Sequence, residues 1–247
     1  MPLAAAVCAA VGLAIGPLVG IIVDRAVERE SFELLLRCPR CGESLGSRSL
    51  IPLIGLSSQC TSEHRSWRYP LTTAATAAGF AIAGFRFGFT WQLWPYLALI
   101  VLLVAMAVID LETKLLLNVL TYPTAIGFLF AVLVLSTPNN YADGIAPALW
   151  AGGLYLAFFM VVHLAYPAGM GLGDVKLAPT LGLAVGWLFT DPIVAIQHML
   201  VALVLGLLLG GITGVVVQRS RKAEVPFGPF MVLGTMIVIA GTVPASV

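Results

Sequence analysis

Charged residues are scarce in this chain of 247 residues, because lysine, arginine, aspartate and glutamate together make up only 10% of it. A hydrophobic fraction of 60% and a mean hydropathy of +0.99 lie far above the values of soluble domains. A water-soluble fold is therefore excluded. The net charge is +1 and no basic patch with interleaved aromatic residues is present, so we expect no nucleic-acid partner.

Several patterns of other functional classes are also missing. The three histidines form no metalloprotease motif, and no Gly-x-Ser-x-Gly sequence marks a serine nucleophile. No internal repeat is evident, which removes the best sequence support for a secondary transporter. The first apolar run lacks a basic start and is followed by further runs, so we expect it to be a retained anchor rather than a signal peptide.

Long apolar runs are what the chain has in abundance. At about 1.5 Å of rise per residue, eight of them are candidate membrane spans. They cover residues 3–23, 71–89, 92–109, 119–136, 145–166, 177–189, 193–217 and 227–243. The sixth is short, so we expect it to be tilted little, buried among its neighbours or extended at its ends. The sequence thus predicts an all-α polytopic integral membrane protein with about eight transmembrane helices.

The basic residues predict the orientation of these helices. We divide the chain into a first transmembrane helix (1–23), a small Cys-containing loop domain (24–70) and a seven-helix membrane domain (71–247). Cytoplasmic loops carry an excess of lysine and arginine. If residues 24–70 are cytoplasmic, alternation places twelve of the thirteen basic residues on that side. We therefore expect both termini to be external.

Two aspartates then lie at the cytoplasmic side. Asp110 is expected to begin the loop after the third run, and Asp174 to lie in the loop before the sixth, within the glycine-rich stretch 169–177. An ionisable residue beside a membrane span is a functional-site candidate, because its burial is costly. Glu112 lies on the same face, but on a continuing helix it would point away from Asp110.

Other acidic residues near the spans are less suitable partners. By the same alternation, Asp143 and Asp191 come out on the opposite face, where we interpret them as solvated loop charges.

A pair of carboxylates offers a specific chemistry. In a partly desolvated site the two cannot both ionise easily, so they can share one proton. In aspartic proteolysis the ionised member takes a proton from water, while the protonated member donates to the scissile carbonyl. One alternative is that Asp110 and Asp174 only satisfy helix ends or neighbours such as Lys114 and Lys176. Others are a transporter that uses both aspartates as a proton or cation site, and a membrane scaffold with a zinc finger.

The cysteines cluster in the long polar segment. Cys38 and Cys41 have the spacing that lets two thiolates bind one tetrahedral metal ion, and Cys60 with His64 would complete a three-Cys, one-His zinc site. A cytoplasmic location keeps thiols reduced, which favours metal binding over a disulfide. Cys8 lies in the first apolar run and is interpreted as a small core residue.

The sequence Gly171-Leu172-Gly173-Asp174 resembles the signature of Gly-x-Gly-Asp intramembrane aspartyl proteases. The longer stretch 169–177 resembles the form found in bacterial type IV prepilin peptidases. Five other sets of residues agree with that family in the same order along the chain: residues 16–25, 38–41, 68–71, Asp110 with 117–118, and 226–230.

This resemblance implies removal of a short basic leader from prepilins or prepseudopilins, at the cytoplasmic side of the bacterial inner membrane. By motif, Asp110 and Asp174 would be the catalytic pair, and Gly171 and Gly173 would allow close approach of the substrate backbone. A related Gly-x-Gly-Asp protease with another membrane substrate is an alternative. Oligomeric state is not predicted.

Many members of this family also methylate the new amino terminus with S-adenosylmethionine. This chain departs from the family pattern in the segment associated with that activity. A second Cys-x-x-Cys is replaced by Cys60, Glu63 and His64, and Thr72 and Thr73 stand where an acidic residue is common. The resemblance therefore predicts peptidase activity and leaves methyl transfer open.

Overall fold

The computed structural model describes residues 1–28, 68–114, 116–136, 142–167, 170–218 and 226–242. Within these ranges the chain forms helices and no strand, which confirms the predicted all-α fold. In chain order, the helices are α1 (Pro2–Glu28), α2 (Arg68–Phe87), α3 (Leu93–Thr113), α4 (Asn118–Ser136), the short 3₁₀ helix η4 (Ala142–Gly144), α5 (Ile145–Ala165), α6 (Leu172–Gly186), α7 (Pro192–Gln218) and α8 (Gly228–Gly241).

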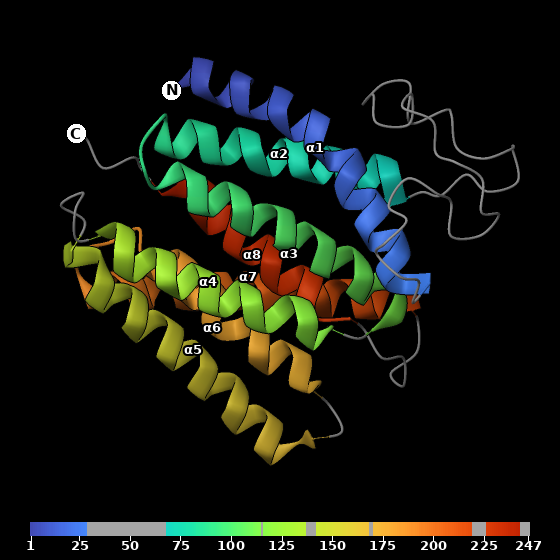
Figure 1. Ribbon diagram of the computed structural model, residues 1–247. Coiled ribbons are helices and arrows are strands. Elements are labelled where there is room, and N and C mark those ends of the chain that lie inside the picture. The colour runs from blue at the N-terminus through green and yellow to red at the C-terminus, as the bar shows by residue number, and fades with distance from the viewer. Residues whose placement is uncertain (29–67, 115, 137–141, 168–169, 219–225, 243–247) are drawn as a thin grey trace, which may run out of the picture.

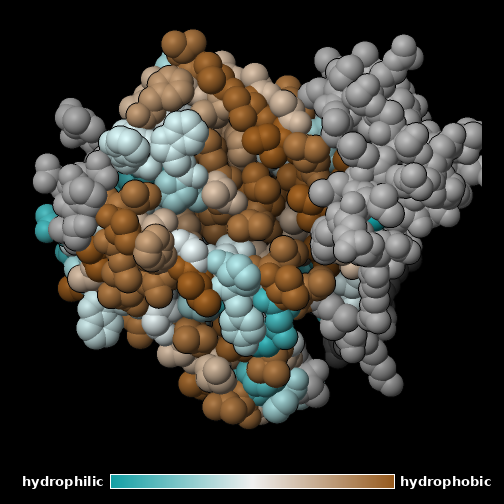
Figure 2. Space-filling model, viewed as in Figure 1, coloured by the Kyte–Doolittle hydropathy of each residue, from teal (hydrophilic) through white to brown (hydrophobic). Residues whose placement is uncertain are grey.

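The eight α-helices fall on the eight predicted apolar runs. Five of them, α1, α3, α4, α5 and α7, are long and apolar enough to cross a membrane by themselves. Figure 2 shows hydrophobic residues over most of the coloured part of the face on view, as expected of a surface that meets lipid. The chain is a polytopic membrane protein.

Helix α6 is the short span that the sequence predicted. Its 15 residues rise about 22 Å, less than the roughly 30 Å thickness of a bilayer core. Most of its residues are buried, from Asp174 to Gly186, and it contacts α4, α5, α7 and α8. A short helix is tolerated here because protein, rather than lipid, surrounds it.

Two antiparallel helix pairs, α1 with α2 and α5 with α6, pack closely at glycine residues. Figure 1 shows α1 lying along α2. A Cβ added at Gly16 of α1 would lie 2.4 Å from the Cα of Thr73 in α2, and one added at Gly182 of α6 would lie 2.6 Å from the carbonyl oxygen of Ala151 in α5. Small residues let helices approach this closely in membranes, where packing rather than the hydrophobic effect drives association.

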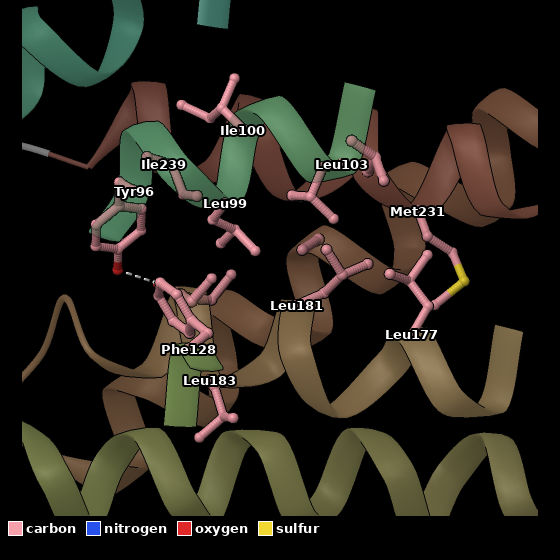
Figure 3. Packing of buried hydrophobic residues seen from close by; sticks show 14 of the residues in the cluster. Tyr96, Leu99, Ile100, Leu103, Phe128, Leu177, Leu181, Leu183, Met231 and Ile239 are labelled. Atoms are coloured by element: carbon pink, nitrogen blue, oxygen red, sulfur yellow. Dashed lines mark hydrogen bonds between the residues drawn. The ribbon is translucent and has the colours of Figure 1, made fainter. Parts of the chain in front are cut away.

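The centre of the bundle is formed by α3, α6 and α8. Figure 3 shows Leu99 and Leu103 of α3, Leu181 of α6 and Met231 of α8 pointing into the same space. At one end of this core, the hydroxyl of the fully buried Tyr96 donates to the carbonyl of Ala184, at 2.5 Å. This bond joins the start of α3 to the end of α6. It therefore also constrains how the end of α3 lies relative to the start of α6.

Those opposite ends lie together on one side of the bundle. In Figure 1, α3 ends and α6 and α8 begin on the right, whereas α1 begins on the left. The predicted aspartates belong to these right-hand ends.

Candidate active site

Asp110 lies in the last turn of α3, inside the helix. The prediction that it begins a loop was therefore wrong, because α3 continues to Thr113 beyond its apolar run. The polar end is stabilised locally: Thr113 donates its hydroxyl to the carbonyl of Ile109, at 2.9 Å, and the backbone N–H of Lys114 donates to the carbonyl of Asp110, at 2.9 Å. Lys114 closes the helix with a left-handed backbone, at φ 54°.

Asp174 lies in the first turn of α6, so its placement in a preceding loop was also wrong. The helix begins at Leu172, five residues before the apolar run, with Gly171 in an extended conformation at its N-cap. The backbone N–H of Asp174 donates to the carbonyl of Gly171, at 3.2 Å. An acidic residue is favourable in a first turn because it faces the positive end of the helix dipole, a signal that hydropathy does not contain.

The structure brings the two carboxylates together and buries both. Asp110 is 4% exposed and Asp174 is 8% exposed, and the charge of Asp110 acts on Asp174. Neither forms an ion pair with another described residue. The interpretation that Lys114 or Lys176 neutralises them gains no support, since both lysines lie elsewhere: Lys176 bonds to Asn118, and Lys114 is exposed.

The start of α8 supplies the site with a second helix N-terminus. The backbone amide of Gly228 donates to the Asp110 carboxyl group. A Cβ added at Gly228 would lie 2.8 Å from Oδ2 of Asp110, so only glycine fits without displacing the carboxylate. That Oδ2 is buried and has no hydrogen-bond partner among the described side chains and backbone. The positive ends of α6 and α8 thus stabilise the negative charge that the pair carries.

Leu116 fills the space beside this pair. A Cβ added at Gly173 would lie 2.7 Å from the Cβ of Leu116, and one added at Gly228 would lie 3.5 Å from its Cδ1. Leu116 therefore contacts the start of α6 and lies beside the start of α8. Nothing in the sequence pattern distinguished it from its two leucine neighbours.

A largely buried ion-pair network lies at the same end of α3. Arg68, the first residue of α2, donates through Nε to Oε1 of Glu112 at 2.6 Å, and through Nη2 to Oε2 of Glu112. Its Nη1 bonds to Oδ1 of Asp24 in α1, at 2.5 Å. Glu112 bonds to Arg68 of α2, which agrees with the prediction that it points away from Asp110. Sequence reasoning did not find the network, since nothing in the chain indicates which charges meet across three helices.

The polar contact at the start of α6 is more exposed. Lys176 donates to Oδ1 of Asn118 in α4, at 2.8 Å, and its Nζ lies 5.2 Å from the ring centroid of Tyr122. This contact ties α6 to α4, as the Arg68 network ties α3 to α2 and α1.

The predicted zinc ligands Cys38, Cys41, Cys60 and His64 lie outside the described residues, so the zinc site stays a prediction. Within the described ranges, no group of three or more His, Cys, Asp or Glu could hold a metal ion. Cys8 is buried in α1, which agrees with its predicted role in the core.

The remaining polar predictions concern residues away from the pair. Nδ1 of His163 lies 2.9 Å from the carbonyl oxygen of Met170, and Nδ1 of His198 lies 2.9 Å from that of Val194. Asp143 and Asp191 are exposed, and Oδ1 of Asp191 accepts from the backbone N–H of Ile193, at 2.8 Å, at the start of α7. None of these groups joins the site.

The chain is similar in sequence to several known proteins. A model of the type IV leader peptidase family matches residues 97–215, which include both aspartates. A Legionella pneumophila protein named prepilin leader peptidase/N-methyltransferase is 32% identical over 212 residues, covering 82% of this chain and 70% of the relative. The chain belongs to the type IV leader peptidase family. It is therefore a membrane peptidase, and the resemblance noted from its motifs is confirmed.

Further relatives from other bacteria bear the same name. A Pseudomonas aeruginosa protein is 33% identical over 215 residues, covering 82% of this chain and 70% of the relative. One from Bacillus subtilis is 30% identical over 210 residues, covering 81% of this chain and 79% of the relative. No solved structure matches the chain. Gly228 and Arg68 lie outside the residues that the family model matches, so their place at the site comes from the fold.

Proposed function

We propose that the chain is an aspartic peptidase that removes the cytoplasmic leader from type IV prepilins or prepseudopilins, with Asp110 and Asp174 as the catalytic pair. Family membership and the printed names of the relatives support the reaction. One observation carries the choice of residues: two buried carboxylates from different helices interact, and no described basic residue neutralises them.

The chemistry follows from sharing one proton between two buried carboxyl groups. The ionised carboxylate takes a proton from the attacking water, while the protonated carboxyl group donates to the carbonyl oxygen of the scissile peptide bond. The roles then reverse as the amine leaves with a proton. The unpartnered Oδ2 of Asp110 is suited to this exchange, because it is a buried acceptor with no competing hydrogen bond among the described residues.

The proposed orientation places this site at the cytoplasmic face of a bacterial inner membrane, with both termini external. The substrate would lie in the bilayer as a single hydrophobic helix, with its basic leader retained in the cytosol. The starts of α6 and α8 and the end of α3 lie on one side of the bundle, which fits cleavage at one membrane face (Figure 1).

The family motif implies close approach of the substrate backbone at Gly171 and Gly173, and of these two we propose Gly171 as the point of approach. Gly171 is exposed, and a Cβ added there would meet nothing closer than Oδ2 of Asp174, at 3.8 Å. Space for a substrate is therefore present at Gly171. At Gly173 the corresponding space holds Leu116.

The names of the relatives also support a second proposal, methyl transfer from S-adenosylmethionine to the new amino terminus. Thr72 and Thr73, which stand where the family commonly has an acidic residue, are buried. Gly20 of α1 packs against Thr72, and Gly16 against Thr73. We also propose that zinc is bound by the segment with Cys38, Cys41, Cys60 and His64. No step of the proposed peptide cleavage involves zinc or S-adenosylmethionine.

The test is cleavage of a co-expressed prepilin by the intact protein and by Asp110→Asn and Asp174→Asn, with methyl transfer followed in the same samples. Asparagine keeps the shape of the side chain but cannot titrate, so each variant should lose about 10²-fold or more in cleavage rate. The control is Asp143→Asn, an exposed carboxylate in η4 that should change nothing.

Glu112→Gln separates this assignment from its nearest alternative. It removes a carboxylate two residues from Asp110 that is bound to Arg68. If Glu112→Gln abolished cleavage while Asp110→Asn retained it, the pair would be wrongly assigned. Proton or cation flux through the wild-type protein, in the absence of cleavage, would instead support the transporter interpretation.

A further inference from the structure

Leu116 occupies an unusual position for an apolar side chain in a connection between two helices. It lies between the end of α3 and the start of α4, two residues after the left-handed Lys114. Its side chain is half-buried and packs against the backbone of Gly173 and near that of Gly228. Gly173 directly precedes Asp174 in α6, and Gly228 of α8 lies against the carboxyl group of Asp110.

The contact with Gly173 explains why a side chain is not tolerated there. An added Cβ would lie 2.7 Å from Cβ, 3.1 Å from Cδ1 and 3.3 Å from Cγ of Leu116. The first atom is next to the backbone and cannot rotate away, so an alanine would push Leu116 or the first turn of α6 aside. Because Asp174 follows Gly173 directly, such a shift would move its carboxylate.

The contact near Gly228 links the same side chain to the other aspartate. A Cβ added at Gly228 would lie 3.5 Å from Cδ1 of Leu116, so the leucine side chain lies close to the start of α8, and the amide of Gly228 bonds to Asp110. Leu116 thus packs against α6, which carries Asp174, and lies beside the start of α8, which holds Asp110. A spacer of fixed size at this point sets how far apart the two elements lie.

Taking the catalytic pair proposed above as given, we infer that Leu116 is a positioning residue of that pair, and that position 173 is glycine in order to admit the side chain of Leu116. This differs from the role of Gly173 in substrate approach. In the substrate role, the space beside Gly173 belongs to the bound peptide. In the spacer role, it belongs to the enzyme's own leucine.

The experiment is a double-mutant comparison in the intact membrane protein, with kcat and KM measured for cleavage of one prepilin. Gly173→Ala should lower kcat at least roughly tenfold, because a small displacement of a catalytic group is costly. Leu116→Gly removes the atom that the new methyl group meets. The double variant Leu116→Gly/Gly173→Ala should therefore recover to the rate of Leu116→Gly alone. The double variant Leu116→Ala/Gly173→Ala, which keeps the Cβ of residue 116, should not recover.

A different pattern of rates would overturn the inference. If Gly173→Ala and its combination with Leu116→Gly were equally impaired, with the defect in KM, then Gly173 would serve the substrate and the inference would be overturned. Gly127→Ala is the matched neutral control, because a Cβ there meets nothing within 4 Å. Gly171→Ala, which does not touch Leu116, should not be rescued by Leu116→Gly.

Single replacements keep the inference testable if Leu116→Gly proves inactive by itself. Leu116→Met preserves an unbranched Cβ and should stay within about threefold of wild type, as volume-conserving exchanges usually do. Leu116→Ile adds a branch at the atom nearest Gly173 and should lose roughly tenfold in kcat. Equal rates for Met and Ile, with equal amounts of folded protein, would contradict the close packing at Cβ. Asp110→Asn is measured in the same assay as a separate test of the proposed function. Cleavage should be lost in this variant whether or not Leu116 is a positioning residue.

Discussion

The two aspartates are held in place by contacts of different kinds. The end of α3, which carries Asp110, is fixed by Arg68, whose guanidinium joins Glu112 to Asp24 of α1 in a largely buried network. The start of α6, which carries Asp174, is held by apolar contact with Leu116 and by the exposed bond from Lys176 to Asn118.

This difference indicates where the site is sensitive to change. Removing one member of a buried ion pair leaves its partners charged and without compensation, which is strongly destabilising. Removing a lysine from an exposed contact leaves its partner in contact with water, which costs little. Equal truncations at the two ends should therefore have unequal effects.

The largest effect is expected from Gly228→Ala, where the two regions meet. Its Cβ would lie 2.8 Å from Oδ2 of Asp110, so the carboxylate must move. A displacement of this order should lower the cleavage rate about 10²-fold. Gly241→Ala in the same helix is the control, because a Cβ there meets nothing within 4 Å. Equal activity of the two alanine variants would show that Asp110 need not occupy its observed position.

Arg68→Ala should come next, with an effect on stability as well as on activity. Asp24 and Glu112 would be left without their common partner, at a cost of about 3 kcal/mol. Thermal unfolding of the purified protein in detergent measures this loss. Arg68→Lys should be intermediate, because lysine keeps the charge but cannot bond to Glu112 through two nitrogens. An unchanged unfolding temperature in Arg68→Ala would mean that the network does not hold α3.

Lys176→Ala should have the smallest effect. The side chain lies near Asp174 in sequence but bonds outward to Asn118, in an exposed contact. We expect a change below about 0.5 kcal/mol in stability and cleavage close to wild type. A severe loss of cleavage with normal stability would instead place Lys176 among the groups that act on the substrate.

Much of the fold was predictable because bilayer thickness leaves a strong mark on sequence. Each predicted apolar run coincides with a helix, and the short sixth run is the buried helix α6. Helix ends were less predictable. Both α3 and α6 extend past their apolar runs into polar residues, since helix formation depends on capping and local hydrogen bonds as well as on hydropathy.

The candidate site was predictable in part for a similar reason. Asp110 and Asp174 are conspicuous because carboxylates are rare beside apolar spans. Gly228 belonged to a recognised motif, but its contact with Asp110 depends on how α8 packs against α3. Arg68 also belonged to a recognised motif, but nothing in that motif indicates that it meets Asp24 and Glu112, and Leu116 carries no signal of its own. Their roles arise from contacts between helices that are far apart along the chain.

The most direct test of the account is whether Asp110 and Asp174 act as a unit. Cleavage rates of Asp110→Asn, Asp174→Asn and the double variant should be compared on one prepilin, with equal amounts of folded protein in the membrane. Residues that share one proton are strongly non-additive, so the account predicts that the double variant is no slower than either single variant. Two large losses that multiply in the double variant, or normal cleavage by either single variant, would contradict a shared-proton pair.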